Sequence, residues 1–343
     1  MSEVQFKTLF DKSLWESFII THPQANFLQS YNWGRFEEQI GKSFFPVAIY
    51  KDDKQIGTAM IIKELAKRGN YLTIAGGPLL DWQATDSKNV FAKFCDFLKE
   101  LAKNENCHFV RVRPQAEDTP QLRKLFEENG FLPSPMHLTA DLTLRLNLSQ
   151  DLEKILAQMR KNTRYEIRKS ERLGIETKII KSSSFMKEFY DQQLYLAKKH
   201  GFIPFDYQFL LKQFEVFADD DQVAFINSYY NNELLASAFV IFYQKEAIYH
   251  YGVSTPKNER LPGSYAAQWA AIQEAKKRGC SEYNFWGVSP LTKTDHRFAG
   301  PSLFKRGFGG YELQHLPAHD LPVSSRYQLI RLFELIRKRI RRL

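Results

Sequence analysis

Residues 52–62 read DDKQIGTAMII, and residues 231–241 read NNELLASAFVI. Both stretches begin with two polar residues typical of a tight turn and continue as a strand rich in small and β-branched residues. The order turn, strand, strand, helix, strand occurs in both halves, at an offset of 179 residues for this first strand. Few residues are identical between the two copies, so the match rests on pattern. It predicts a chain built from an internal duplication.

The helices and last strands of the two copies also correspond. In the first copy, an apolar helix over 91–102 leads into the strand CHFVRVRP at 107–114. In the second copy, a helix over 266–275 leads into CSEYNFWG at 280–287, an offset of 173 residues. Only the second copy continues into SLFKRGFGG at 302–310. This asymmetry predicts that the second half kept or gained chemistry while the first became a platform.

The length of 343 residues is typical of two domains. Hydrophobic residues make up 43% of the chain, enough for two cores. We expect an α/β fold of mixed α+β type, with residues 1–147 and 322–343 in the first domain and 148–321 in the second. The N-terminus has no apolar signal core, and no apolar run is long enough to span a bilayer. These features predict a cytoplasmic protein.

Several kinds of site are excluded by the sequence. Cys95, Cys107 and Cys280 are too few and too scattered for a disulfide framework or a zinc site. The chain has no glycine-rich phosphate loop of the nucleotide hydrolases, no Gly-x-Ser-x-Gly elbow and no His-Glu-x-x-His motif. We therefore expect no bound metal and no resident cofactor.

The net charge of +9 is concentrated in two segments, of which the first is RKNTRYEIRKSER at 160–172. Within it Arg160, Arg164 and Arg168 recur at a spacing of four, so a helix continuing from Asp151 would carry them on one face. A solvated helix face is the ordinary explanation for such a run. Because only two glutamates interleave with the six basic residues, the pattern favours an anionic partner such as RNA or phosphate.

The second basic segment is the C-terminus, where we expect a helix that begins near Ser324 or Ser325. Its apolar stripe would consist of Leu329, Leu332, Phe333, Ile336, Ile340 and Leu343, and its basic face of Arg331, Arg337, Lys338, Arg339, Arg341 and Arg342. This composition is typical of a helix at an anionic membrane surface. The alternative is that the stripe packs on the protein while the basic residues are solvated. The two alternatives are compatible along one helix.

The repeated order of strands and helix is the core order of the acetyl-coenzyme-A-dependent N-acyltransferases, a GNAT-like fold. In those enzymes, the turn before the helix has two small residues that let backbone N–H groups hold pyrophosphate. The corresponding turn here reads RLPGSYA at 260–266, so Gly263 is in place but Tyr265 occupies the second small position. Its side chain would obstruct pyrophosphate. The sequence thus predicts the fold without its coenzyme A site.

With these features, the chain resembles the Fem family of tRNA-dependent aminoacyltransferases over nearly its whole length. The most specific parts are MRKNTRYEIRK at 159–169, QWA at 268–270, YNFWG at 283–287 and FKRGFGG at 304–310. The resemblance implies two tandem GNAT-like domains, with the C-terminal helix returning to the first. It also implies aminoacyl-tRNA as donor and a peptidoglycan precursor as acceptor, in interpeptide-bridge formation for cell wall biogenesis. No long heptad-patterned insertion is present, so we expect no coiled-coil arm.

The resemblance also implies roles for single residues. The family's Phe-Lys pair falls on Phe304 and Lys305, and a fixed ammonium there would stabilise the oxyanion of the acyl transfer. Without the resemblance, a lysine in a glycine-rich hairpin would be a solvated surface residue. A basic residue that holds the acceptor's diphosphate in some relatives falls on Arg35, and two acceptor-contacting tyrosines fall on Tyr207 and Tyr251.

Departures from the family leave the acceptor's head group open, so a lipid-linked and a UDP-linked muropeptide both fit. A second arginine of the diphosphate clamp has no clear equivalent near 201–205, and Arg113 stands in place of an acidic residue. The enzyme would work in the cytoplasm, at the inner face of the membrane. The alternative function is a coenzyme-A-dependent N-acyltransferase acting on another amine, against which Tyr265 argues. A catalytically silent scaffold of the same fold is a third reading.

Overall fold

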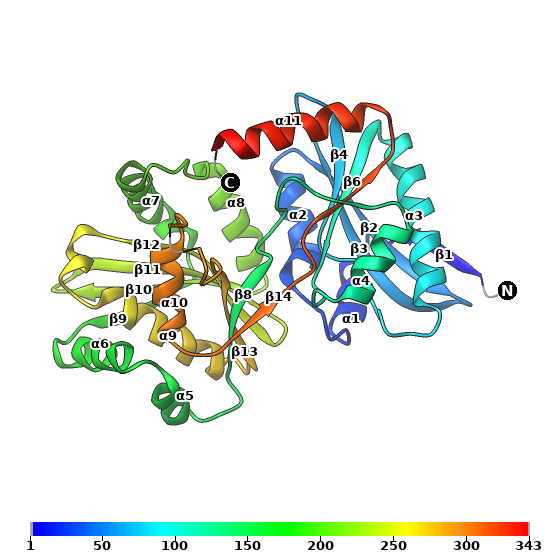
Figure 1. The fold of residues 1–343 in the computed structure, drawn as a ribbon. Coiled ribbons are helices and arrows are strands. Elements are labelled where there is room, and N and C mark those ends of the chain that lie inside the picture. Colours follow the sequence, from blue (N-terminus) through cyan, green and yellow to red (C-terminus); the bar gives the residue numbers. More distant parts are fainter. Residues whose placement is uncertain (1–2, 294, 342–343) are drawn as a thin grey trace. The chain divides into compact units, whose positions relative to one another are not determined.

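The computed structural model describes residues 3–293 and 295–341 (Figure 1). It divides into two compact units, of which unit 1 comprises Met1–Asp141 and Gln314–Leu343 and unit 2 comprises Leu142–Leu313. Each unit has its own mixed sheet and its own helices. This architecture confirms the expected mixed α/β fold. Among the described residues, no helix is both long enough and apolar enough to cross a bilayer.

Unit 1 is built on a sheet with the strand order β1-β2-β3-β4-β6-β15-β7, to which β5 adds by pairing with β3. The strands are β1 (Val4–Thr8), β2 (Ser43–Lys51), β3 (Lys54–Glu64), β4 (Asn70–Gly76), β5 (Leu79–Leu80), β6 (Cys107–Pro114), β7 (Leu132–Pro133) and β15 (His319–Pro322). The helices are α1 (Lys12–Ile19), η1 (Phe27–Gln29), α2 (Tyr31–Gln39), α3 (Ser87–Asn104), α4 (Pro120–Glu128) and α11 (Arg326–Arg341). The apolar face of α3, with Phe91, Phe94 and Leu98, is buried in the core of this unit.

Unit 2 repeats the arrangement with the order β14-β8-β13-β12-β11-β10-β9. The strands are β8 (Leu142–Asn147), β9 (Glu176–Ile180), β10 (Val223–Tyr230), β11 (Glu233–Tyr243), β12 (Glu246–Ser254), β13 (Glu282–Gly287) and β14 (Tyr311–Gln314). The helices are α5 (Leu152–Gln158), α6 (Lys161–Arg172), η2 (Ser183–Phe185), α7 (Met186–His200), α8 (Tyr207–Ala218), η3 (Pro256–Glu259), α9 (Gly263–Lys277) and α10 (Ala299–Arg306). One face of the sheet packs on α9 through Val240 and Ile272, and the other packs on α8 through Phe239 and Phe214.

The internal duplication is present in the backbone geometry. The β2–β3 turn at 52–53 and the β10–β11 turn at 231–232 both have positive φ at their two central residues, of 48° and 65° and of 50° and 62°. This is the geometry of a type I′ hairpin turn, which Asn and Asp tolerate. Each hairpin also shifts register just before the turn, at 49/50 and at 228/229. Turns and bulges are therefore offset by the same 179 residues as the sequence pattern.

The strand pairing places the boundaries between the two units at residues different from those expected from the sequence. β8 lies antiparallel to β13 in unit 2, whereas the sequence placed it at the end of the first domain. β15 lies antiparallel to β6 in unit 1, whereas its first residues were expected in the second domain. The boundaries are therefore 141/142 and 313/314. The C-terminal helix α11 belongs to unit 1, as expected.

The two units differ in their parallel strand pairs. β4 pairs with β6 from Asn70↔Cys107 to Gly76↔Pro114, over the whole length of β4. β12 and β13 pair from Glu246↔Glu282 to Ile248↔Asn284, although β12 continues to Ser254. The parallel strands β12 and β13 of unit 2 thus separate after three residue pairs, whereas β4 and β6 of unit 1 stay paired to the end of β4. This separation lies in the half of the chain that the sequence expected to carry chemistry.

Candidate active site

Lys305 lies in the last turn of α10, so it is carried by a helix and not by the glycine-rich hairpin expected from the sequence. Its Nζ donates a hydrogen bond of 2.8 Å to the carbonyl oxygen of Gly287, where β13 ends. The Nζ also lies 5.7 Å from the ring centre of Tyr249 on β12. Lys305 is therefore held between the end of β13 and Tyr249, the first residue of β12 beyond its pairing with β13.

The charge of Lys305 is tuned by its surroundings. Its side chain is partly exposed, but burial of the ammonium group lowers its pKa from 10.5 to about 8. The group is thus mostly protonated at neutral pH and becomes neutral in mildly alkaline solution. A lysine held in this way can place a positive charge beside a developing negative one.

A kink at the end of β13 presents the Gly287 carbonyl. Trp286 has a φ of 63°, which is unusual for a bulky residue, and its N–H donates to Asn284 Oδ1 at 2.8 Å. The Asn284 amide donates to Glu246 at 3.0 Å, and Glu246 forms an ion pair of 3.3 Å with Arg145. This polar network joins β8, β12 and β13 and holds the kink in place.

Aromatic packing fixes the orientation of α10. The ring of Phe304 lies 5.0 Å from that of Tyr265 and 5.2 Å from that of Phe308. Tyr265 stands in the first turn of α9, so it joins the two helices. Phe304 therefore helps to position Lys305, because its packing anchors the helix from which the ammonium projects.

Polar contacts hold α10 from its other side. Ser302 Oγ accepts the N–H of Ser289 at 2.8 Å, and the Arg306 guanidinium donates to the Ser289 carbonyl at 2.6 Å. Both contacts are made to the segment that directly follows β13. The helix and the strand end that frame Lys305 are thus tied to each other.

The N-terminus of α9 is occupied by the protein itself. The N–H of Ser264 donates to Asn258 Oδ1 at 2.7 Å, and a Cβ added at Gly263 would come within 2.3 Å of the Leu235 Cβ. The Tyr265 ring fills the adjoining space against α10. This packing argues against pyrophosphate binding at the turn, in agreement with the argument from sequence. In the part of the chain that the structure describes, no cluster of His, Cys, Asp and Glu is placed to hold a metal ion.

A bulge in β12 sends its two tyrosines to different faces of the sheet. Tyr249 pairs with Val240 and Tyr251 with Phe239, and the register shifts between them. Their partners Val240 and Phe239 are consecutive residues of β11, so they point to opposite faces of the sheet. Tyr249 accordingly lies on the α9 face with Lys305, and Tyr251 lies on the α8 face. The structure therefore does not place Tyr251 in the group around Lys305.

Tyr207 is the first residue of α8, on the same face as Tyr251. The ring of Phe205, two residues earlier, lies 5.1 Å from the ring of Tyr251. The ring of Tyr207 itself packs on Tyr190 of α7 at 5.4 Å. Tyr251 thus packs on an exposed Phe205, and Tyr207 packs on a different partner, Tyr190.

Arg35 belongs to unit 1. It is exposed on α2 and forms an ion pair of 2.5 Å with Glu38, one turn further along the helix. Trp33, two residues earlier, packs edge-on against Phe27 at 5.5 Å. Arg35 is thus a solvent-facing cation near a half-buried tryptophan.

The basic segment does not form the continuous helix expected from the sequence. α5 ends at Gln158, and Arg160 has extended backbone as the N-cap of α6. Met159, at the C-cap of α5, and Ile167, on α6, are both buried in the core of unit 2. The three arginines therefore do not form one ladder.

Each arginine of the segment has a different environment. The Arg160 guanidinium donates to the Leu303 carbonyl, and its backbone N–H donates to Gly307 at 2.9 Å, which ties the segment to α10. The Arg164 guanidinium donates to the carbonyls of Ala157, at 3.0 Å, and of Met159, where it caps α5. Arg168 is exposed. A hollow of about 550 Å³ between α5 and α6 is lined by Glu153, Leu156, Ala157, Arg164 and Arg168.

Sequence reasoning missed the surroundings of Lys305. Tyr249, Gly287 and Asn284 were not identified as parts of the site. The sequence signal for this part of the site was the polar Asn284 within the aromatic strand YNFWG, which ends in Gly287. It could not have revealed the contact with Lys305, because that contact depends on the helical path of 299–306.

Comparison with known proteins gives consistent matches. The model of the FemAB family matches residues 11–129 and 219–335. The aminoacyltransferase FemA of Staphylococcus epidermidis is 31% identical over 111 residues, which is 32% of this chain and 27% of that protein. The alignment thus spans about a quarter of the length of this curated relative.

Two solved structures are similar in fold. A crystal structure of FemX matches with a TM-score of 0.84 and 15% identity, over 96% of this chain and 100% of that one. A tandem GNAT protein from the clavulanic acid biosynthesis pathway matches with a TM-score of 0.59 and 10% identity, over 94% and 99%. Both likenesses confirm that units 1 and 2 are tandem GNAT-like domains.

Proposed function

This chain belongs to the FemAB family, and from that premise we propose that it transfers an amino acid from aminoacyl-tRNA to the amine of a peptidoglycan precursor's stem peptide. The reaction would extend an interpeptide bridge on the cytoplasmic side of the membrane. The observation that carries the proposal is the ammonium group of Lys305, fixed between the end of β13 and Tyr249 of β12 with a pKa of about 8.

The chemistry needs a cation at this place. The acceptor amine attacks the ester carbonyl, a C–N bond forms, and the carbonyl oxygen becomes an oxyanion. The C–O bond to the ribose then breaks, and a proton passes from the amine nitrogen to the ribose oxygen. Because the ester is already activated, no metal or further cofactor is needed. A fixed donor aimed at the oxyanion is worth roughly 3–4 kcal/mol of barrier.

Lys305 meets the requirements of that donor. One N–H of its ammonium group is held by Gly287, and a lysine carries three, so others remain to meet a substrate oxygen. Its position is set by α10, which is anchored by Phe304 and Ser302. Partial burial strengthens its attraction for a negative charge, since electrostatic interactions weaken in water.

We assign the donor's phosphates to the basic segment. Arg160 connects this segment to α10, and Arg168 and Arg164 line the hollow between α5 and α6. Phosphate groups of RNA are the ligands that such arginines bind best. The CCA end of the tRNA would then run from the hollow along α10 toward Lys305.

We assign the acceptor to residues whose family counterparts contact it. Arg35 would hold the diphosphate, and Tyr207 and Tyr251 would contact the muropeptide. The exposed cation on α2 and the exposed aromatic ring of Phe205 beside Tyr251 support these roles. Both a lipid-linked and a UDP-linked precursor satisfy this chemistry.

The proposal is tested by following the labelled donor. Purified protein is mixed with tRNA charged with radiolabelled amino acids and with either precursor, and acetyl-coenzyme A is supplied in a parallel reaction. We expect label to pass from tRNA to the precursor and no acetyl group to be transferred. Acetyl transfer without aminoacyl transfer would overturn the assignment in favour of a coenzyme-A-dependent enzyme.

A further inference from the structure

Helix α11 carries a row of large apolar residues on its exposed side. Their exposed fractions are 71% for Leu329, 56% for Leu332, 44% for Leu335, 50% for Ile336 and 76% for Ile340. Tyr327 and Ile330 are the buried apolar residues of the helix. An ordinary surface helix buries its apolar stripe, and α11 does the reverse.

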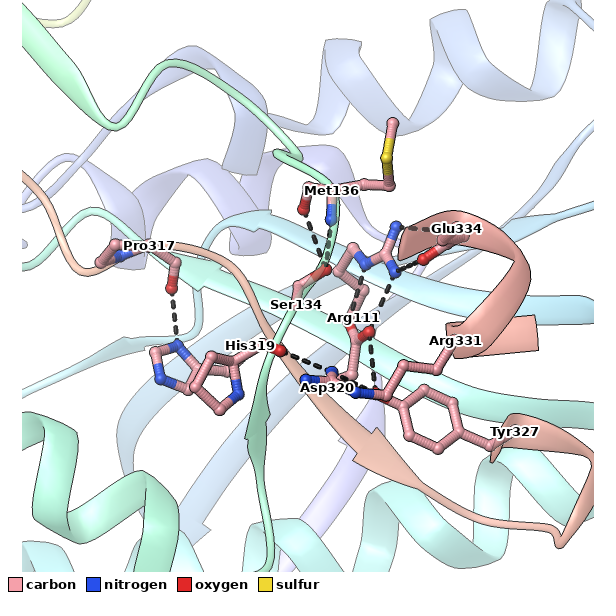
Figure 2. Close-up of polar contacts among 10 residues, drawn as sticks. Arg111, Ser134, Met136, Pro317, His319, Asp320, Tyr327, Arg331 and Glu334 are labelled. Atoms are coloured by element: carbon pink, nitrogen blue, oxygen red, sulfur yellow. Dashed lines mark hydrogen bonds and ion pairs between the residues drawn. The ribbon is translucent and has the colours of Figure 1, made fainter. Parts of the chain in front are cut away.

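The buried side of α11 is held by a polar network, which Figure 2 shows in close-up. Arg111 of β6 forms ion pairs of 2.7 Å with Asp320 of β15 and with Glu334 of α11. The Tyr327 hydroxyl donates to Asp320 at 3.1 Å, and Arg331 donates to the Tyr327 hydroxyl at 3.1 Å. Arg111 and Asp320 are buried, so separating them would leave a charge inside the protein without its partner.

This network decides which face of the helix points outward. With about 3.6 residues per turn, Tyr327, Ile330 and Glu334 share one side of the helix, and Leu329 and Ile336 lie on the opposite side. The apolar stripe therefore cannot rotate inward without breaking the ion pair of Arg111 with Glu334 and the hydrogen bond from Tyr327 to the buried Asp320. The alternative from sequence, in which the stripe packs on the protein, is wrong for the exposed Leu329, Leu332, Ile336 and Ile340, whereas Phe333 is half-buried. Arg342 and Leu343 of the expected helix lie outside those residues.

Cations surround the exposed stripe. Arg337, Lys338 and Arg339 lie within it along the chain, and the loop between β3 and β4 adds an exposed Arg68. The Arg68 guanidinium stacks on the ring of Phe333 at 3.4 Å. A hollow of about 400 Å³ at this contact is lined by Arg68, Phe333, Ile336, Arg337 and Ile340. Two guanidinium groups thus stand beside apolar side chains, as a phosphate joined to acyl chains requires.

We propose that α11, together with Arg68, is a docking surface for an anionic lipid membrane. The stripe of leucines and isoleucines enters the lipid interface, and Arg68 and Arg337 bind lipid phosphate. A second copy of the chain fits this surface poorly, because a symmetric contact would bring the same cations against each other. The proposal rests on α11 and Arg68 and does not depend on the chemistry at Lys305.

The test measures sedimentation of the whole chain with vesicles of phosphatidylglycerol and phosphatidylcholine, and with vesicles of phosphatidylcholine alone. We expect strong binding to the anionic vesicles, weakened by salt, and little binding to the neutral ones. Each cation at the surface is worth ~1 kcal/mol, so Arg337→Gln with Arg339→Gln should lower the partition coefficient about 25-fold. Ile336→Gln with Ile340→Gln should lower it at least about tenfold, by loss of apolar burial.

The matched control is Ile20→Gln, which changes an exposed isoleucine at the end of α1 in the same unit. This variant should bind like the parent, and all variants should unfold at the parent's temperature, since the changed residues are at the surface. Equal binding to both vesicle types, or binding that neither double variant changes, would overturn the proposal. If the chain does not bind vesicles but forms a dimer, and the double change Ile336→Gln with Ile340→Gln dissociates that dimer, the stripe would be a contact with a second copy. No tRNA or muropeptide is present, so the result is independent of the proposed reaction.

Discussion

Lys305 combines a fixed position with a lowered pKa. Its ammonium is held by the Gly287 carbonyl, and burial brings its pKa down to about 8. The resemblance to the Fem family identified this residue from the sequence. Its helix, its carbonyl partner and its closeness to Tyr249 could not be predicted, because they depend on how 299–306 folds back onto the end of β13.

The lowered pKa predicts how the reaction depends on pH. Since the pKa lies below the ordinary value, the ammonium is present below about pH 8 and is lost above it. We expect the single-turnover rate to fall as the pH rises through this value, because a neutral amine does not stabilise an oxyanion. Rapid-quench measurements between roughly pH 6.5 and 9.5 would show this alkaline limb.

The variant Lys305→Arg tests whether the fall in rate at alkaline pH comes from Lys305 or from another titrating group. The variant should be slower at every pH, because a planar guanidinium places its charge differently. It should nevertheless lose the alkaline fall, since arginine stays charged throughout this range. An alkaline limb with an unchanged midpoint in the variant would attribute the titration to another group.

At the scale of elements, the basic segment shows what a charge pattern leaves undetermined. The spacing of Arg160, Arg164 and Arg168 predicts one face of a helix that continues from Asp151, but that helix is broken at Met159, and Arg160 is the N-cap of the second helix, α6. The periodicity of the sequence does not reveal this break, because Met159 at the break and Ile167 beyond it are spaced as on one helix face and are both buried. The three side chains consequently have different partners.

We predict that changing two of these arginines affects different properties, tRNA affinity in one case and stability in the other. Arg168→Ala should weaken tRNA binding and reduce the slope of log affinity against log salt by about one unit. Arg164→Ala should mainly lower the free energy of unfolding, by about 1 kcal/mol, because its guanidinium caps the carbonyls of α5. Filter binding over a range of salt and urea denaturation measure the two effects, with the exposed Lys277→Ala as control. A salt slope unchanged by Arg168→Ala would remove this residue from the tRNA site.

The attachment of α11 to unit 1 makes a second prediction at this scale. Arg111→Met should lower the free energy of unfolding by about 3–5 kcal/mol, because it leaves the buried Asp320 carboxylate without its cation. Lys187→Met removes one partner of an exposed ion pair with Asp191 on α7 and should cost less than about 1 kcal/mol. Urea denaturation compares the two variants. Equal and small losses would mean that the ion pairs of Arg111 with Asp320 and with Glu334 of α11 contribute little to the stability of unit 1.

At the scale of the whole molecule, the sequence revealed the duplication but not its edges. The hairpin turns at 52–53 and 231–232 could be predicted, because polar turns followed by small-residue strands are local signals. The boundaries could not, because β8 and β15 are short strands that pair with partners far away in the chain. The apolar stripe of α11 was identified correctly, but periodicity cannot tell whether such a stripe faces the protein or the solvent.

The two halves have diverged in one structural respect that bears on function. The parallel strands of unit 1 pair along the whole of β4, while those of unit 2 separate after Ile248 and Asn284. The end of β13 thereby becomes the place where Lys305 is held. The duplication thus supplies two similar sheets, and we propose that the second one carries the chemistry.

The most direct test of this account is the single-turnover rate of aminoacyl transfer by Lys305→Ala. We predict a fall of roughly 100- to 1,000-fold, the loss expected for one oxyanion donor, with donor and acceptor affinities nearly unchanged. Lys277→Ala, an exposed lysine at the far end of α9, should transfer at the parent's rate. A Lys305→Ala enzyme that reacts within a few-fold of the parent would contradict the role of this ammonium in catalysis.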